Sequence, residues 1–356
     1  MLFRESIFVT GFPGFIASRL VERLANSETQ FFLLVEPRFV DKAIEEVELI
    51  SEEQGVPLEA FSIVEGDITK PDLGISDEDL EVIRTETTQI FHLAAVYDLA
   101  VDKDLAFRVN LEGTKNVNAL AASIKGLRRY NYVSTCYVAG KRTGRILETE
   151  LEHDAGFRNN YEETKYLAEM EVEKLKDSLP VTIYRPSVVV GDSETGETAK
   201  YDGIYYLIQY LRKAPSILRL VNVGNDKVRL NLVPVDFVVE AIAALASDGA
   251  AQGKTLAIAD PEPLTTAELF DVIAKELSGR KSEFKPSPKL VEWFLNTGVS
   301  PRVTGLPGFA VPYFFIEQEY DTKLAADALK KHGIKCPSFA SYTANLLDFV
   351  DEFPRL

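Results

Sequence analysis

Residues 7–17 constrain the fold of this chain more than any other stretch, because they read Ile-Phe-Val-Thr-Gly-Phe-Pro-Gly-Phe-Ile-Ala. Apolar β-favouring residues lead into Gly11, and apolar residues recur at helical spacing after Gly14, so the pattern predicts a strand, a tight turn and a helix. Such a turn suits a pyrophosphate, since glycine lets the backbone approach the anion and the helix N-terminus attracts it. A glycine turn after a buried strand can also be only a turn. The residues that we expect to contact a dinucleotide here are Gly11, Phe12, Pro13, Gly14, Phe15 and Ile16.

The next strand supplies the second signal for a dinucleotide. Residues 30–35 form an apolar run, which is typical of a strand buried on both faces of a parallel sheet. Glu36 follows this run about 20 residues after the glycine turn, where a dinucleotide-binding fold places an acid on the adenosine ribose. A carboxylate there favours NAD because it repels the 2′-phosphate of NADP, whereas the nearby Arg38 could accept that phosphate. The sequence therefore predicts a mild preference for NAD, with a solvated loop at Glu36 and Arg38 as the alternative.

Further strands are expected at 61–64, 91–95 and 130–135, with helical stretches between them. This alternation predicts a doubly wound parallel sheet whose ligand crevice lies at the carboxyl ends of the strands. His92 lies within the strand 91–95 and is expected to be a packed core imidazole. Asn110 falls in a helix expected to cross beside the site, or is a helix-surface amide. The residues at this strand end over which a cofactor could lie are Leu93, Ala94 and Ala95.

Tyr161 and Lys165 are the candidates for acid–base chemistry. They lie four residues apart on a predicted helix and hence on one face, where the ammonium would lower the pKa of the phenol from its usual value of about 10. A tyrosine tuned in this way suits proton donation to a carbonyl that is being reduced near neutral pH. Such pairs are common on protein surfaces, and this one gains its weight from the elements that precede it: the glycine turn, the acid, and the hydroxyls of Ser134 and Thr135.

Length and composition restrict the class of protein. A chain of 356 residues suits one large α/β domain, or a main domain with a smaller lobe. A net charge of −16 disfavours nucleic acid and anionic membranes as partners, although a helix N-terminus can still hold one phosphorylated cofactor. The cysteines and histidines are too far apart for a metal site or a disulfide framework. Because no apolar run reaches roughly 20 residues and the first strand comes too early for a signal peptide, we expect a cytoplasmic protein without an integral membrane segment.

The ordered set of motifs resembles the extended short-chain dehydrogenase/reductase superfamily. Within that superfamily it is similar to the fatty acyl-CoA reductase and thioester reductase branch, which has a male-sterility-type NAD-binding domain. The stretches that carry this resemblance are 66–74, 134–140, 185–196 and 231–236. The resemblance implies a Rossmann-like fold and a catalytic triad of Thr135, Tyr161 and Lys165. It also implies that the adenine contacts Asp67 and Ile68, and that the nicotinamide is bordered by Pro186, Ser187, Val188 and Val189.

Some positions depart from the pattern of the superfamily. Ala17 replaces the usual third glycine, and Glu36 stands where NADPH-using relatives commonly carry arginine. Cys136 and Tyr137 occupy the positions of the acidic pair that sugar-nucleotide dehydratases carry, so dehydration is not expected. A nucleophilic role for Cys136 is not expected either, because neither a helix start nor an adjacent cation is present to lower its pKa.

These observations predict an NAD(P)-dependent reductase of a hydrophobic acyl thioester, carried by CoA or a separate carrier protein and reduced to an aldehyde or an alcohol. The alternatives are an alcohol/ketone oxidoreductase, a sugar-nucleotide epimerase and a non-catalytic dinucleotide-binding sensor. We expect a dinucleotide-binding domain at 1–190 with 228–260, and a smaller, mostly helical substrate lobe at 191–227 with 261–356. Residues 303–316 are expected to be a lid or a cover of the core. The cations expected to guide the phosphates of CoA are Lys200, Arg212 and Lys213.

Overall fold

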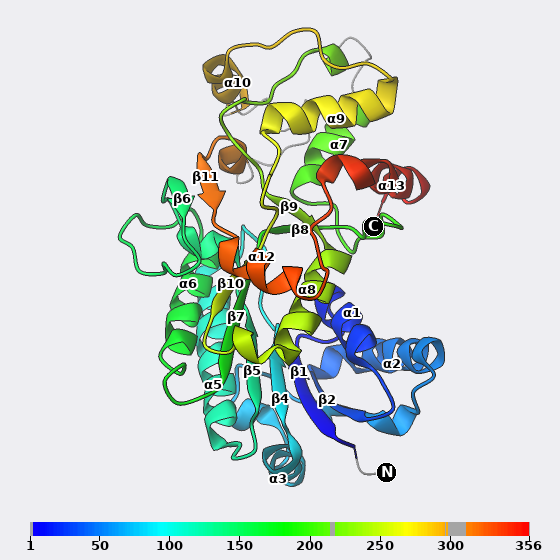
Figure 1. Cartoon of the computed structure of the whole chain (residues 1–356), viewed down its shortest axis with the longest axis vertical. Coiled ribbons are helices and arrows are strands. Elements are labelled where there is room, and N and C mark those ends of the chain that lie inside the picture. Colours follow the sequence, from blue (N-terminus) through cyan, green and yellow to red (C-terminus); the bar gives the residue numbers. More distant parts are fainter. Residues whose placement is uncertain (1–2, 214–217, 296, 298–310, 356) are drawn as a thin grey trace.

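A seven-stranded parallel sheet forms the centre of the molecule, and the computed structural model describes residues 3–213, 218–295, 297 and 311–355 (Figure 1). Its strands are β1 Glu5–Thr10, β2 Thr29–Val35, β3 Phe61–Glu65, β4 Gln89–His92, β5 Arg129–Val133, β7 Val181–Pro186 and β10 Thr255–Ile258. Their order is β10-β7-β5-β4-β1-β2-β3, and each neighbouring pair is parallel. The direction of winding reverses between β1 and β4, which is where a sheet of this kind opens a ligand crevice. The predicted doubly wound sheet is confirmed.

Helices cover both faces of this sheet, because its strands are apolar on both sides. On β1, Ile7 and Val9 belong to one core and Phe8 to the other, as the two-residue period of a strand requires. The first core is closed by α1 Phe15–Leu24, α2 Val40–Gln54, α8 Val235–Ser247 and α12 Lys323–Lys330. The second is closed by α3 Asp77–Glu86, α5 Gly113–Ser123 and α6 Asn160–Glu173.

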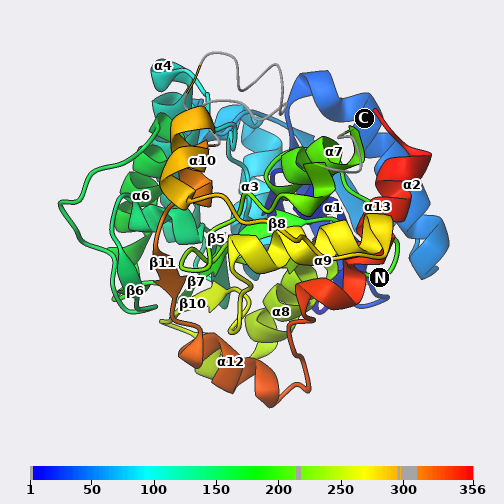
Figure 2. The same ribbon diagram turned by 90° about the horizontal axis from the view of Figure 1, so that it is seen from above.

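A smaller, mostly helical lobe lies beyond the carboxyl ends of the strands (Figure 1). It contains α7 Ile204–Lys213, α9 Thr266–Ser278, α10 Pro288–Leu295 and α13 Phe339–Glu352. Its core includes Ile208, Phe270 and Leu346, none of which is exposed. Seen from above, these helices lie between α6 on one side and α2 on the other (Figure 2). Strands β8 Val188–Val190 and β9 Leu232–Pro234 pair with each other where the chain enters the lobe and returns.

The domain boundaries 1–190 with 228–260 and 191–227 with 261–356 remain a proposal. Within the second segment, α12 returns to pack against β10 and α8. Another short pair, β6 Gly144–Ile146 with β11 Gln318–Tyr320, joins the C-terminal segment to the loop that precedes α6. Of the predicted lid or cover, residues 303–310 lie outside the described residues, and Val311–Phe314 form a 3₁₀ helix, η8.

Two predicted strands end earlier in the structure than the sequence indicates. The strand expected at 91–95 ends at His92, since the amide of Leu93 donates to the carbonyl of Thr10 and that of Ala94 to its hydroxyl, outside the sheet ladder. The strand expected at 130–135 ends at Val133, so Ser134 and Thr135 follow it rather than form its last residues.

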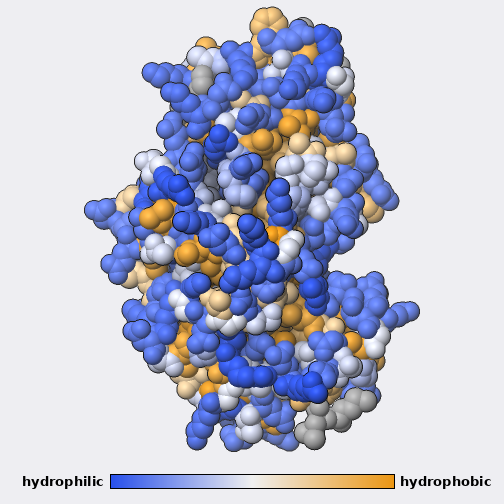
Figure 3. Space-filling view, viewed as in Figure 1, coloured by the Kyte–Doolittle hydropathy of each residue, from blue (hydrophilic) through white to orange (hydrophobic). Residues whose placement is uncertain are grey.

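Polar side chains cover most of the surface seen in Figure 3, with smaller apolar areas among them. Scattered exposed apolar residues are normal on a folded domain. In the part of the chain that the structure describes, we find no helix with the length and apolar character needed to cross a membrane.

Candidate active site

The glycine turn after β1 brings the backbone close to the end of β4. Gly11 has φ +92°, and a Cβ built on it would lie 2.8 Å from the amide nitrogen of Ala94. A Cβ on Gly14 would lie 2.5 Å from the carbonyl oxygen of Gly11, so neither position accepts a side chain. Gly14 is the N-cap of α1, where the described residues provide no side-chain cap and the first turn carries no acid. The unpaired N–H groups of this turn therefore suit the pyrophosphate of a dinucleotide.

The expected acid at the end of β2 is paired with its neighbour. Glu36 Oε2 lies 2.8 Å from Arg38 Nη2, and the guanidinium lies 4.6 Å from the centre of the Phe39 ring. The two charged side chains are 46% and 70% exposed, respectively, so the pair contributes little to stability and either group is free to meet a ligand.

The two residues expected beside the adenine, Asp67 and Ile68, follow β3, which is the strand next to β2. Asp67 Oδ1 accepts from the Thr69 amide at 2.8 Å, which fixes the turn. The Ile68 carbonyl accepts from Asn116 Nδ2 at 2.7 Å, and the Ile68 side chain is largely buried against Gly113. Both residues thus lie on a rigid turn at the carboxyl edge of the sheet.

Asn110 holds the segment after β4 in place. It lies on the π-helical turn Phe107–Glu112 and is 1% exposed, so the helix-surface alternative is wrong. Its Oδ1 accepts from the Val96 amide at 2.8 Å, and its Nδ2 donates to the Val96 carbonyl at 3.1 Å. The same Nδ2 donates to Thr164 Oγ1 on α6 at 3.0 Å. The amide therefore ties the stretch that follows Leu93, Ala94 and Ala95 to the helix that carries Tyr161.

His92 is a core imidazole, as expected. It is 1% exposed, with Nδ1 at 2.7 Å from Thr10 Oγ1 and Nε2 at 3.0 Å from Thr114 Oγ1. Burial, with the positive charge of Lys165 as a smaller cause, lowers the pKa of His92 to about 3. The imidazole is therefore neutral at physiological pH and takes its place in the packing between β1 and α5.

Thr135 and Tyr161 come together from two elements. Thr135 directly precedes the 3₁₀ helix η5, Cys136–Ala139, and accepts from the Tyr137 amide at 3.2 Å. Tyr161 lies in the first turn of α6, half-buried, with the hydroxyl of Thr135 near enough to affect the pKa of its phenol. Burial raises the pKa of Tyr161 to about 12, the nearby hydroxyl of Thr135 opposes this rise, and the charge of Glu162 adds to it. The phenol is therefore protonated at neutral pH.

Lys165 lies one turn later on α6 and points toward β5. Its Nζ donates to Tyr132 Oη at 3.0 Å and to the Val133 carbonyl at 2.9 Å, and it lies 4.6 Å from the Tyr132 ring centre. Burial lowers the pKa of Lys165 to about 8, and the charge of Glu169 opposes this change. The predicted lowering of the Tyr161 pKa by Lys165 is wrong for this structure, because the ammonium is directed to β5 and burial dominates at the phenol.

A buried ion pair anchors α6 to the sheet. Glu169 is not exposed, and its Oε1 accepts from Arg185 Nε at 2.9 Å and from Nη2 at 2.5 Å. Its other oxygen accepts from Ser134 Oγ, and Arg185 Nη1 donates to the Glu150 carbonyl at 3.0 Å. Because Ser134 precedes Thr135, this network fixes α6 against the strand end that carries the hydroxyl of Thr135.

The residues expected beside the nicotinamide connect β7 to β8. Pro186 ends β7, and Val188 and Val189 form β8. Between them the amide of Ser187 donates to the Ile258 carbonyl at 3.1 Å. The Oγ of Ser187 is buried and has no hydrogen-bond partner among the described residues, which fits a ligand group beside it.

Two other kinds of chemistry find little support here. Cys136 is 3% exposed, its Sγ lies 3.2 Å from the Arg185 carbonyl oxygen, and burial raises the pKa of its thiol, so it is no nucleophile. Among the residues that the structure describes, no group of three or more His, Cys, Asp and Glu side chains is placed to hold a metal ion.

The cations expected to guide CoA differ in their availability. Arg212 Nη1 donates to the Val350 carbonyl at 2.9 Å and Nη2 pairs with Asp351, so this side chain joins α7 to α13. Lys200 lies 3.6 Å from an oxygen of Asp202 and 5.0 Å from the centre of the exposed Tyr97 ring. The side chain of Lys213 lies outside the described residues.

Comparisons with known proteins concern the family and the fold of the chain. A family model described as male sterility protein matches residues 9–242. The fatty acyl-CoA reductase wat of Drosophila melanogaster is 26% identical over 280 residues, which cover 68% of this chain and 54% of that protein. The chloroplastic fatty acyl-CoA reductase 2 of Arabidopsis thaliana is 25% identical over 73% of this chain and 53% of its own length. This chain thus spans about half the length of the curated relatives that it matches.

Solved structures share the fold. The terminal R domain of the myxalamid PKS-NRPS pathway superposes with a TM-score of 0.82 at 24% identity, covering 99% of this chain and 92% of that one. A thiolation-reductase di-domain of an archaeal non-ribosomal peptide synthetase has a TM-score of 0.76 at 18% identity, covering 99% and 76%, respectively.

Sequence reasoning missed the charged residues that support the site. Glu162 is fully buried next to Tyr161, and its spacing of three residues from the helix cap Asn159 is a helix-start signal that could have drawn attention to it. Its partner Tyr313 lies 151 residues away, and the bond between Glu169 and Arg185 joins two different elements. Sequence spacing does not show such long-range contacts.

Proposed function

Because the chain belongs to the male sterility protein family, we propose that it is an NAD(P)H-dependent oxidoreductase that reduces acyl thioesters. The observation that carries the proposal is that Thr135 and Tyr161 come together at the carboxyl end of the doubly wound sheet, together with a glycine turn that suits a pyrophosphate. The names of the fatty acyl-CoA reductases among the relatives support a thioester as the substrate.

The nicotinamide group, when bound, supplies the hydride for this reaction. In the proposed site, Thr135 Oγ1 and Tyr161 Oη donate hydrogen bonds to the carbonyl oxygen of the thioester, where negative charge develops during reduction. Tyr161 also gives that oxygen a proton, since a phenol with a pKa of about 12 is still protonated at neutral pH. Loss of the thiol then gives the aldehyde, so one thioester, one hydride and one proton yield one aldehyde and one thiol. A second reduction would give the alcohol.

The chain's own residues would hold each part of the dinucleotide. Gly11, Phe12, Pro13, Gly14, Phe15 and Ile16 form the pyrophosphate turn, and Asp67 and Ile68 lie beside the adenine. Asn110 holds the segment of Leu93, Ala94 and Ala95, across which the cofactor lies. Lys165 contributes to ribose binding, and Pro186, Ser187, Val188 and Val189 border the nicotinamide. At the adenosine ribose, Glu36 gives the protein a mild preference for NAD over NADP despite the nearby Arg38.

We propose a hydrophobic acyl group on CoA or on a separate carrier protein as the substrate. Each methylene that an apolar pocket buries is worth about 0.8 kcal/mol, so efficiency on acyl-CoAs should rise severalfold per carbon until the chain protrudes. Lys200 is the candidate for contact with the CoA phosphates, because Arg212 is held by α13. The cytoplasmic location expected from the sequence stays a prediction.

A screen of dinucleotide oxidation tests this function. The purified protein would be given NADH or NADPH with acyl-CoAs of increasing length, acyl-pantetheines, an acyl-carrier protein, ketones and nucleotide sugars, and Tyr161→Phe would serve as the control. Turnover of thioesters alone, increasing with chain length, is the expected result. Dinucleotide oxidation with ketones but with no thioester would replace the proposal with an alcohol/ketone oxidoreductase. Conversion of a nucleotide sugar, followed by chromatography because it causes no net dinucleotide oxidation, would replace it with an epimerase. Dinucleotide binding without turnover of any substrate would indicate a sensor.

A further inference from the structure

The carboxylate of Glu162 is buried directly beside the candidate proton donor Tyr161. Glu162 lies in the first turn of α6 and is not exposed. Its Oε2 accepts from the backbone amide of Arg158 at 2.9 Å, and its Oε1 lies 3.2 Å from Arg158 Nη1. A buried carboxylate is stable only when its oxygens have donors, so these contacts hold the first turn of the helix in a defined place.

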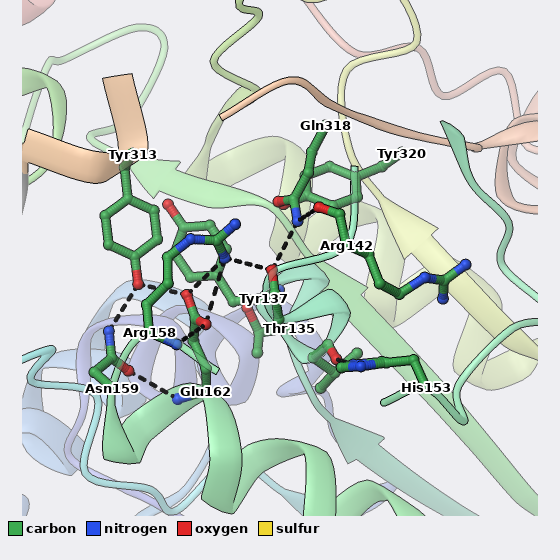
Figure 4. Close-up of polar contacts among 12 residues, drawn as sticks. Thr135, Tyr137, Arg142, His153, Arg158, Asn159, Glu162, Tyr313, Gln318 and Tyr320 are labelled. Atoms are coloured by element: carbon green, nitrogen blue, oxygen red, sulfur yellow. Dashed lines mark hydrogen bonds and ion pairs between the residues drawn. The ribbon is translucent and has the colours of Figure 1, made fainter. Parts of the chain in front are cut away.

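The third donor to Glu162 comes from the C-terminal segment. Tyr313, on η8, donates its hydroxyl to Glu162 Oε1 at 2.6 Å and accepts from Asn159 Nδ2 at 2.7 Å (Figure 4). Asn159 is the cap of α6, and its Oδ1 accepts from the Glu162 amide at 3.0 Å. One phenol therefore bonds to the residues on both sides of Tyr161 in the first turn of the helix. Its ring lies against Tyr137, with 4.8 Å between the ring centres.

The same C-terminal segment also holds the loop that follows Thr135. Gln318 Nε2 donates to the Gly140 carbonyl at 2.7 Å and to the Arg142 carbonyl at 2.6 Å. Arg158 Nη1 donates to the same Gly140 carbonyl, so this oxygen joins the loop to the start of α6. In Figure 4, Tyr313 points down to Asn159 and Glu162, and Gln318 points down toward Arg142. The elements that carry Thr135 and Tyr161 thus share one support, which lies more than 150 residues later in the chain.

We propose that Tyr313 is a positioning residue, which acts through Glu162 and Asn159 to hold Tyr161 in place beside Thr135. This inference rests on the proposed function, because it needs Tyr161 to donate a proton. It assigns to η8 a role in the reaction although Tyr313 is bonded to the helix and not to the substrate. A displacement of a donor by about 1 Å can lower a rate by about 10²-fold, so the loss of one support is expected to be measurable.

Tyr313→Phe tests the proposal, because it keeps the ring against Tyr137 and removes only the two hydrogen bonds of the hydroxyl. We expect kcat on the best thioester to fall about 10-fold or more, while KM for the dinucleotide stays within about twofold. Amide hydrogen exchange in the first turn of α6 should also become faster, since the cap and the buried carboxylate both lose a partner. Glu162→Gln removes the charge and replaces one acceptor oxygen with an NH2 group, so it weakens the same set of bonds, and the double variant should lose less activity than the two single losses predict.

Tyr205→Phe is the matched control. Tyr205 is another buried phenol of the C-terminal half, and its hydroxyl accepts from the Gly191 amide at 2.9 Å rather than from α6. This variant should keep kcat within about twofold of the unmodified protein and leave exchange in α6 unchanged. A Tyr313→Phe protein with normal kcat would overturn the proposal even if exchange were faster, because Tyr313 would then be only structural. A fall in kcat no larger than that of Tyr205→Phe would overturn it as well.

Hydrogen exchange separates this proposal from the proposed function. If the unmodified protein reduces no thioester, the proposed function fails. Amide hydrogen exchange in the first turn of α6 still shows whether the Tyr313 hydroxyl stabilises that turn. Faster exchange there in Tyr313→Phe than in Tyr205→Phe would support the stabilisation of the helix start by Tyr313. Equal exchange in the two variants would overturn the inference without reference to any substrate.

Discussion

Replacing Glu169 with glutamine should destabilise the protein far more than replacing Glu171 with glutamine on the same helix. Glu169 and Arg185 are 0% and 5% exposed, and Glu169 accepts from the arginine and from Ser134. Glu169→Gln keeps the size of the side chain but leaves a buried guanidinium without its counter-charge. Removing one member of a buried pair costs about 3–5 kcal/mol.

Glu171→Gln is the matched control on the same helix. Glu171 and Lys174 are 31% and 63% exposed, with 2.8 Å between Oε1 and Nζ. Exposed pairs at this spacing contribute about 0.3–0.5 kcal/mol, because water screens the charges. The two substitutions change the same chemical group and the same net charge, so the difference between them isolates the effect of burial.

Urea unfolding, followed by circular dichroism, measures both effects. Glu169→Gln should lower the free energy of unfolding by about 3 kcal/mol or more and move the urea midpoint down, whereas Glu171→Gln should be within about 0.5 kcal/mol of the unmodified protein. Because the charge of Glu169 also raises the pKa of Lys165, its loss should lower that pKa further below its value of about 8. Equal midpoints for the two variants would refute the view that this ion pair anchors α6.

Tyr161→Phe should lower turnover by about 10²-fold or more while dinucleotide binding, measured by NADH fluorescence, persists, and near-normal turnover would remove Tyr161 from the mechanism. Glu36→Ala should narrow the difference between the Kd values for NADH and NADPH by relieving repulsion of the 2′-phosphate, and tighter NADPH binding by the unmodified protein would mean that Arg38 dominates. Burial lowers the pKa of Lys165 from 10.5 to about 8. Between these pH values the native state therefore binds fewer protons than the unfolded state, so the free energy of unfolding rises with pH. Lys165→Met should flatten that rise, measured as the melting temperature from pH 7.5 to about 10.5. The same pH dependence in the variant and the unmodified protein would contradict the lowered pKa of Lys165.

The parts of this molecule that could be predicted from the sequence are those that depend on local patterns. The turn at Gly11 and Gly14 needs glycine for steric reasons, and residues 31–35 are apolar because β2 is buried on both faces. Tyr161 and Lys165 lie on one helix face because four residues make about one turn.

The direction of a side chain across the fold could not be predicted in the same way. Lys165 meets Tyr132 on β5, and Tyr313 meets Glu162, through contacts that only the packing of the chain creates. The end of β4 at His92 was missed because the hydroxyl of Thr10 takes the amide of Ala94 in place of a sheet partner. Such hydrogen bonds depend on the register of two strands rather than on residue type.

Transfer of a labelled hydride tests the central claim most directly. The protein would be incubated with an acyl-CoA and with nicotinamide dinucleotide carrying deuterium at both C4 positions, and the products would be examined by mass spectrometry. The account predicts one deuterium on C1 of an aldehyde product, or two on C1 of an alcohol, and about 10²-fold less labelled product with Tyr161→Phe at the same enzyme concentration and time. Dinucleotide oxidation that leaves no deuterium in any acyl-derived product would contradict it.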